Sequence, residues 1–136
     1  MYPRAFLQVA VTAISIALSA SMAAASDARA LVDADWLDQH FRSPGIVVLD
    51  VRGDRRSYIA GHVPGAVYTD YNEEWRRTVK GVPDLLPTVE KLADVIGKLG
   101  IGNADHVIVV GAGIESADMA IAARIYWTLK SIGHGK

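Results

Sequence analysis

The side chains best suited to chemistry gather in two stretches, and the first contains a carboxylate, a guanidinium and an imidazole. Asp50 and Arg52 follow an apolar run, and His62 comes downstream in a turn with Pro64 and Gly65. Such groups can hold charge or move a proton. A lone histidine without a neighbouring nucleophile makes a weak catalytic site, however, so we expect His62 mainly to brace its turn.

The second stretch follows the strand-like run 106–110 and leads into a helical pattern. Its residues are Gly111, Ala112, Gly113, Ile114, Glu115 and Ser116. Glycine-rich turns between a strand and a helix offer backbone N–H groups to anions, including dinucleotides. The dinucleotide pattern has a third glycine where Ser116 stands, and it follows the first strand of a fold rather than a later one. We therefore expect no nucleotide here.

Several function classes are excluded by composition. The chain has 136 residues and no cysteine, which rules out a thiol nucleophile, a disulfide and a cysteine-ligated zinc site within it. The histidines His40, His106 and His134 have no ligand spacing, so we predict no metal and no cofactor. The formal net charge is −1, without a basic run, so no nucleic-acid partner is expected.

The first 25 residues have the order of a secretory signal peptide. Arg4 precedes a mostly apolar run over 5–20, and Ala23-Ala24-Ala25 forms an Ala-x-Ala cleavage site. Residues 28–30 form a second such site. The apolar run is shorter than the roughly 18 to 20 residues of a membrane-spanning helix. We expect cleavage after Ala25, no stable membrane anchor, and a periplasmic or secreted product.

Elements with strand and helix patterns alternate along the rest of the chain. Strands are predicted over 46–49, 66–68 and 106–110, and helices over 32–41, 55–60, 88–99 and 116–132. Continuous apolar strands separated by helices indicate an α/β fold with a parallel sheet. We expect 69–86, including Trp75, to run over the surface, and Tyr126 and Trp127 to pack in the core.

The same residues resemble a known family. The stretches 49–52 and 58–68, with Asp-x-Arg followed by Gly-His-x-Pro-Gly-Ala, are similar to the rhodanese family. Residues 107–110, 122–127 and 133–134 resemble the N-terminal, cysteine-free half of tandem thiosulfate/3-mercaptopyruvate sulfurtransferases. The resemblance implies a rhodanese-like domain over 31–136, with a three-layer fold around a parallel sheet. It marks Asp50, Arg52, His62, Pro64 and Gly65 as family positions with mainly structural roles.

The resemblance also implies a function that this chain cannot perform alone. Rhodanese-family enzymes move a sulfane sulfur from thiosulfate or a mercapto acid to a thiophilic acceptor through a cysteine persulfide. They place the cysteine in the loop that corresponds to residues 111–116. No cysteine stands there, so we expect no catalytic residue in this chain and a catalytic cysteine in a second rhodanese domain of the same polypeptide. The alternative is a non-catalytic binding or scaffolding module.

The family sheet contains one more strand than this sequence supplies. That strand follows the Gly-His pair and lies inside the sheet, whereas the sequence given stops at Lys136 soon after Gly133-His134. We therefore expect a domain that is incomplete at its C-terminus.

Overall fold

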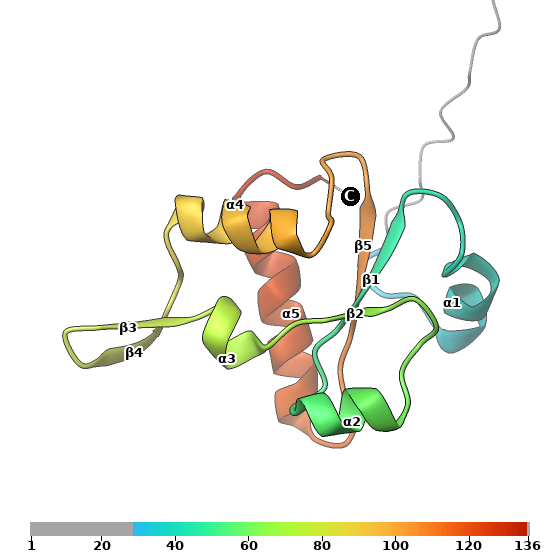
Figure 1. Cartoon of the computed structure of the whole chain (residues 1–136), viewed down its shortest axis with the longest axis horizontal. Helices are drawn as coiled ribbons and strands as arrows, with labels where there is room; N and C mark the ends of the chain where they lie inside the picture. Colours follow the sequence, from blue (N-terminus) through green and yellow to red (C-terminus); the bar gives the residue numbers. More distant parts are fainter. Residues whose placement is uncertain (1–28, 136) are drawn as a thin grey trace, which may run out of the picture.

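The structure, a computed structural model, describes residues 29–135, so the expected signal peptide over 1–25 lies outside the described residues. Helices and strands alternate along most of this part of the chain (Figure 1). In chain order they are α1 (Ala34–His40), β1 (Ile46–Asp50), α2 (Arg55–Ala60), β2 (Val67–Tyr68), α3 (Tyr71–Glu74), β3 (Arg77–Val79), β4 (Val82–Leu85), α4 (Val89–Lys98), β5 (His106–Val110) and α5 (Ser116–Ser131). Within residues 29–135, none of the helices has the length and apolarity that a membrane crossing requires.

The central sheet is parallel and has the strand order β2-β1-β5. Leu49 of β1 pairs with Val67 of β2, and Asp50 pairs with Val110 of β5. Buried apolar runs with few polar interruptions suit strands that are covered on both faces. The predicted α/β fold with a parallel sheet is confirmed, and the carboxyl ends of β1 and β5 meet at one edge.

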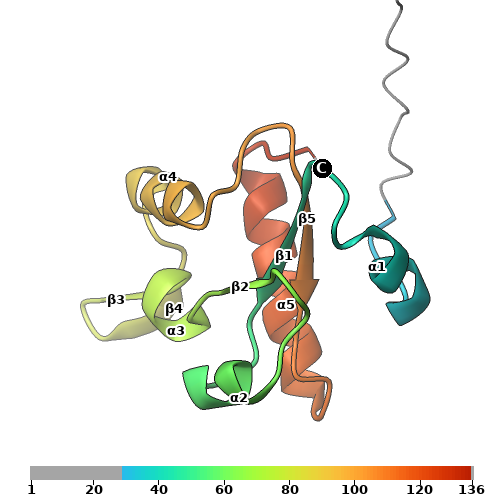
Figure 2. The same cartoon turned by 45° about the vertical axis from the view of Figure 1, so that its right-hand side comes forward.

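Two separate sets of apolar side chains cover the two faces of this sheet. Because successive strand residues point to opposite faces, Leu49 and Val48 belong to different clusters. Leu49 packs with α4 and α5, whereas Val48 packs with Ile108 and the apolar residues of α1. Figures 1 and 2 show α1 on one side of the sheet and α4 and α5 on the other. The predicted three layers are therefore present.

Short polar side chains cap the first turns of α1 and α4. The carboxylate of Asp33 accepts from the N–H of Trp36 at 2.7 Å, and the hydroxyl oxygen of Thr88 accepts from the N–H of Lys91 at 3.3 Å. Both bonds satisfy N–H groups that lack a partner inside the helix. Gly100 ends α4 with a φ of 74°, a conformation that glycine adopts without strain.

The segment 69–86 is more ordered than the expected surface excursion. It contains α3 and the antiparallel hairpin of β3 and β4, joined by a turn at Lys80 and Gly81. The side chain of Trp75 is only 1% exposed, and its indole N–H donates to the Thr69 hydroxyl oxygen at 2.8 Å. The expectation that Trp75 lies on the surface was therefore wrong. The charged residues around it give the segment the pattern of a surface loop, although the Trp75 side chain itself is buried.

The expectation for Tyr126 and Trp127 was also wrong. These side chains are 42% and 52% exposed, and the face of α5 that reaches the core contains Ile125 and Leu129. Tyr126 lines a cavity of about 250 Å³ beside β5, and residues 29–32 are also among its walls. Within the described chain β5 pairs with β1 alone, so its other edge faces this cavity.

Candidate functional site

The two stretches that the sequence analysis singled out meet where β1 and β5 end, at the edge of the sheet formed by the carboxyl ends of the strands. Asp50 ends β1, Val110 ends β5, and the two residues are paired in register. The N–H of Val51 donates to the carbonyl oxygen of Val110 at 2.9 Å. In open α/β sheets, ligands bind outside the carboxyl ends of the strands. This edge is therefore the candidate site.

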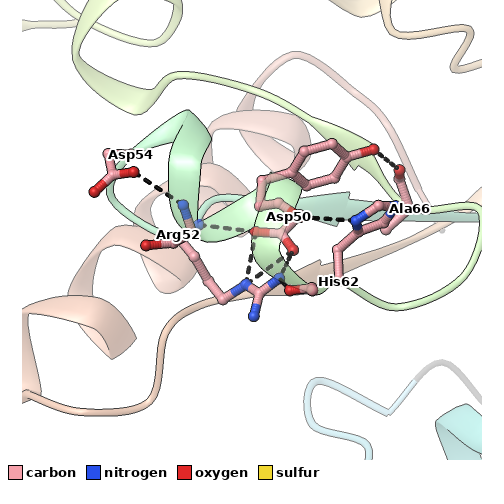
Figure 3. Close-up of polar contacts among 8 residues, drawn as sticks. Asp50, Arg52, Asp54, His62 and Ala66 are labelled. Carbon is pink, nitrogen blue, oxygen red and sulfur yellow. Dashed lines mark hydrogen bonds and ion pairs between the residues drawn. The ribbon is translucent and has the colours of Figure 1, made fainter.

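Asp50 and Arg52 form an ion pair at this edge, and the Arg52 side chain is 25% exposed (Figure 3). The Asp50 side chain is fully buried. The Nε of Arg52 donates to the two carboxylate oxygens at 3.0 and 2.9 Å, and Nη2 donates to Oδ2 at 2.7 Å. Hydrogen bonding to Asp50 raises the pKa of Arg52 above its ordinary value. Nη2 also donates to the carbonyl oxygen of Gly61, so the pair ties β1 to the end of α2.

His62 makes its contacts within the turn that contains it. Its Nδ1 lies 2.8 Å from the carbonyl oxygen of Tyr58, which can only accept, so Nδ1 carries the proton. The imidazole stacks on the Tyr58 ring at 3.9 Å between centroids. The N–H of Ala66 donates to the carbonyl oxygen of Val63 at 2.9 Å across Pro64 and Gly65, and the φ of 81° at Gly65 is that of a type II turn.

Two backbone donors of the loop 111–116 are occupied by a carboxylate of the protein itself. Oδ2 of Asp118 accepts from the N–H of Ile114 at 2.9 Å and from the N–H of Glu115 at 3.0 Å. The bond from Glu115, and to a smaller extent the bond from Ile114, hold the pKa of Asp118 below its ordinary value. Backbone donors that could stabilise a substrate anion therefore already hold an internal one.

The surface around this loop also disfavours an anionic sulfur compound. A hollow of about 320 Å³ lies beside it, and the carboxylates of Glu115 and Asp118 are among its walls. A Cβ atom built on Gly111 would lie 3.1 Å from the backbone oxygen of Asp118, closer than most real contacts. A cysteine at this first loop position would therefore push against the first turn of α5.

The sequence indicates the loop 111–116 as a possible anion-binding turn, but the contact of Asp118 with this loop was not predicted. The available signal was an acidic residue three positions after Glu115, at the start of an apolar helix. That spacing is typical of reciprocal capping, in which the later side chain reaches back to the N–H of the earlier residue. Within residues 29–135, no three histidine, aspartate or glutamate side chains gather as metal ligands would.

The Asp118 contact predicts a pH-dependent opening of the loop. Because the pKa of Asp118 is depressed in the fold, its stabilising contribution is present above its ordinary pKa. The contribution is lost as the pH falls below about 4 towards the folded-state pKa. NMR should show the Ile114 and Glu115 amide resonances moving together in this acid range. Asp118→Asn should abolish that movement, and an unchanged titration in the variant would show that another group causes it.

Comparison with known proteins agrees with this geometry. Residues 33–135 match the rhodanese-like domain, and the chain belongs to that family. It is 37% identical over 117 residues to thiosulfate sulfurtransferase of Cricetulus griseus, covering 78% of this chain and 38% of that protein. It is 31% identical over 125 residues to human 3-mercaptopyruvate sulfurtransferase, covering 83% and 41%. The 3-mercaptopyruvate sulfurtransferase of Escherichia coli K12 is 33% identical over 111 residues, covering 75% and 38%. The chain thus spans about two fifths of the length of these relatives.

Proposed function

We propose that this chain is the cysteine-free domain of an exported sulfurtransferase. The whole protein would move sulfane sulfur from thiosulfate or a mercapto acid to a thiophilic acceptor. The observation that carries the proposal is the loop 111–116, which corresponds to the cysteine-bearing loop of the family. This loop contains no cysteine, and the amides of Ile114 and Glu115 already donate to Asp118. Sulfur transfer through a persulfide requires a thiolate nucleophile, which this domain cannot supply.

The catalytic cysteine would lie in a second rhodanese-like domain of the same polypeptide. The sulfurtransferases that this chain resembles are more than twice its length, which leaves room for such a domain. In this arrangement the present domain would support the second one and form one wall of a cleft for small sulfur compounds. The internally paired Asp50 and Arg52 suit that supporting role, because their contacts fix the edge of the sheet.

The proposal includes a further strand, because within residues 29–135 nothing pairs with the outer edge of β5, and Tyr126 of α5 is exposed. His134 places its Nε2 3.0 Å from the carbonyl oxygen of Asp105, so the chain returns to the start of β5 after α5. A strand entering there would run parallel to β5 through a right-handed crossover, the strongly preferred connection. It would fill the cavity between β5 and residues 29–32, and it would cover Tyr126.

Reading the coding sequence beyond the codon for Lys136 tests this proposal. We expect an apolar strand of about five residues, the usual strand length. A second rhodanese-like domain with a cysteine in its loop should follow. A stop codon directly after Lys136 would contradict the proposal and favour the non-catalytic binding module.

Export is proposed from the first 25 residues alone. Edman sequencing of the protein recovered from the periplasm or medium should start at Ser26, because Ala23-Ala24-Ala25 precedes it. Ala25→Pro should block this cleavage, because signal peptidase requires a small residue at that position. A protein that retains Met1 after export would show that the segment is not cleaved.

A further inference from the structure

The cavity of about 250 Å³ beside β5 is bounded by three segments of the chain, which are β5, α5 and residues 29–32. Its walls are mainly apolar, with Leu31 from the first residues, Val107 and Val109 from β5, and Tyr126 from α5. An apolar cavity of about 150 Å³ is large enough to hold benzene. The cavity beside β5 therefore has room for an aromatic ring with a small substituent.

The wall that α5 contributes contains two small residues. Ala122 and Ala123 lie between Met119 and Tyr126, and their methyl groups leave space that a larger side chain would fill. Two apolar side chains at the cavity are in contact with water, since Leu31 is 73% exposed and Tyr126 is 42% exposed. Removing apolar surface from water is favourable, so an apolar group that enters the cavity is bound by the hydrophobic effect.

The charged side chains at this cavity are cations. Lys130 and Arg29 line it, whereas none of its walls within residues 29–135 is an aspartate or a glutamate, although the whole chain has a formal net charge of −1. The Nζ of Lys130 lies 5.5 Å from the centre of the Tyr126 ring and donates to the carbonyl oxygen of Gly135 at 2.7 Å. An ammonium group has three N–H donors, so Lys130 can also donate to an anion beside the ring.

We propose that this cavity binds a small aromatic carboxylate, with the ring between β5 and α5 and the carboxylate at Lys130. Ligand sites typically combine an apolar lining with a few polar groups that fix the orientation of the ligand. A carboxylate forms a charge-assisted hydrogen bond with an ammonium group, which is stronger than a bond between neutral groups. The anion is therefore preferred over an uncharged ring compound of the same size, and a cationic ligand would be repelled.

The strand proposed to follow residue 136 would enter the same space. The carboxylate and that strand therefore exclude each other, and the ligand binds the domain while its sheet lacks the strand. Binding to the 136-residue chain requires neither a second domain nor sulfur transfer. The two proposals can fail separately: a stop codon after Lys136 would leave the ligand site intact, and failure to bind the ligand would leave the sulfurtransferase assignment intact.

Isothermal titration of the chain with sodium 2-naphthoate, at ionic strength held constant with sodium chloride, tests the site. We expect saturable binding to a single site. Ala123→Phe should weaken this binding roughly tenfold or more, because the added ring takes the volume that the ligand needs in a close-packed protein. Ala120→Phe is the matched control, since Ala120 is an exposed alanine of α5 outside the cavity walls, and it should bind as the unaltered chain does.

The role of the charge is tested with Lys130→Gln and with an uncharged ligand. Lys130→Gln should weaken the binding of 2-naphthoate about fivefold, the upper range for a partly exposed ion pair. Lys91→Gln is its control, because Lys91 is an exposed lysine of α4 away from the cavity, and it should have no effect. The neutral analogue 2-naphthalenemethanol should bind the unaltered chain and Lys130→Gln equally.

Absence of saturable 2-naphthoate binding would overturn the proposal. Equal weakening by Ala120→Phe and Ala123→Phe would also overturn it, because the ligand would then lie elsewhere on α5. Equal weakening by the two lysine variants would do the same, because the effect would then reflect net charge. Circular dichroism checks the fold of each variant. Should Ala123→Phe fail to fold, the comparison of Lys130→Gln with Lys91→Gln decides, since Lys130 belongs to neither core cluster.

Discussion

Thiocyanate should form no faster than in buffer when this chain is incubated with thiosulfate and cyanide. The reaction needs a thiolate that accepts the outer sulfur, and the sequence has no cysteine. Enzymes typically accelerate reactions by a factor of about 10⁶ or more, so the absence of the nucleophile removes an effect of many orders of magnitude. Colorimetric detection of thiocyanate as its iron complex measures the rate.

The thiosulfate sulfurtransferase of Cricetulus griseus, to which this chain is similar, is the positive control for this assay. The control should turn over under identical conditions and lose its activity after alkylation. A rate that rises in proportion to the concentration of the present chain, and survives alkylation, would contradict the persulfide requirement. Ser116, the hydroxyl of the loop, would then be the first residue to replace.

Asp50→Asn should lower the free energy of unfolding by about 2–3 kcal/mol, the usual cost of losing hydrogen bonds between charged groups at a buried side chain. Asp50 is fully buried, and its carboxylate is the acceptor for both Nε and Nη2 of Arg52. An asparagine would turn an N–H₂ group towards the guanidinium or accept through one oxygen alone. For a domain of this size the fall in Tm should be roughly 10–20 °C. Thermal denaturation followed by circular dichroism measures it.

Asp94→Asn is the matched control for this substitution. Asp94 also pairs with a cation, Lys98, at 2.8 Å, but both side chains are at least half exposed. Exposed pairs contribute little because water screens them, so the Tm should hardly change. Equal effects of the two variants would show that the Asp50–Arg52 pair does not fix the edge of the sheet.

The layers of the fold could be predicted from the sequence because local patterns and burial agree. The runs 46–49 and 107–110 are apolar without interruption, and they lie in β1 and β5, the adjacent strands with the longest ladder. Asp33 and Thr88 precede α1 and α4, near the starts of the helices predicted over 32–41 and 88–99, and their side chains cap these helices. Each of these sequence patterns lies within a few residues of the strand or helix that it forms or caps.

The parts that could not be predicted depend on distant contacts. Trp75 stands among charged residues, and its burial follows from packing against Leu92 and Ile125, which lie in later helices. Tyr126 has the apolar character of a core residue, yet it is 42% exposed and lines the cavity beside β5. Asp118 could be placed at the start of α5, but its two bonds to the loop depend on the path of the backbone there.

The central proposal is that the sulfur-carrying cysteine lies outside this chain but within the same polypeptide. Mass spectrometric mapping of the native, full-length gene product after treatment with thiosulfate tests this most directly. Trapping with an alkylating reagent should place the persulfide on a cysteine C-terminal to residue 136, in a rhodanese-like loop. A native product that carries no persulfide, or that ends at Lys136, would contradict the account.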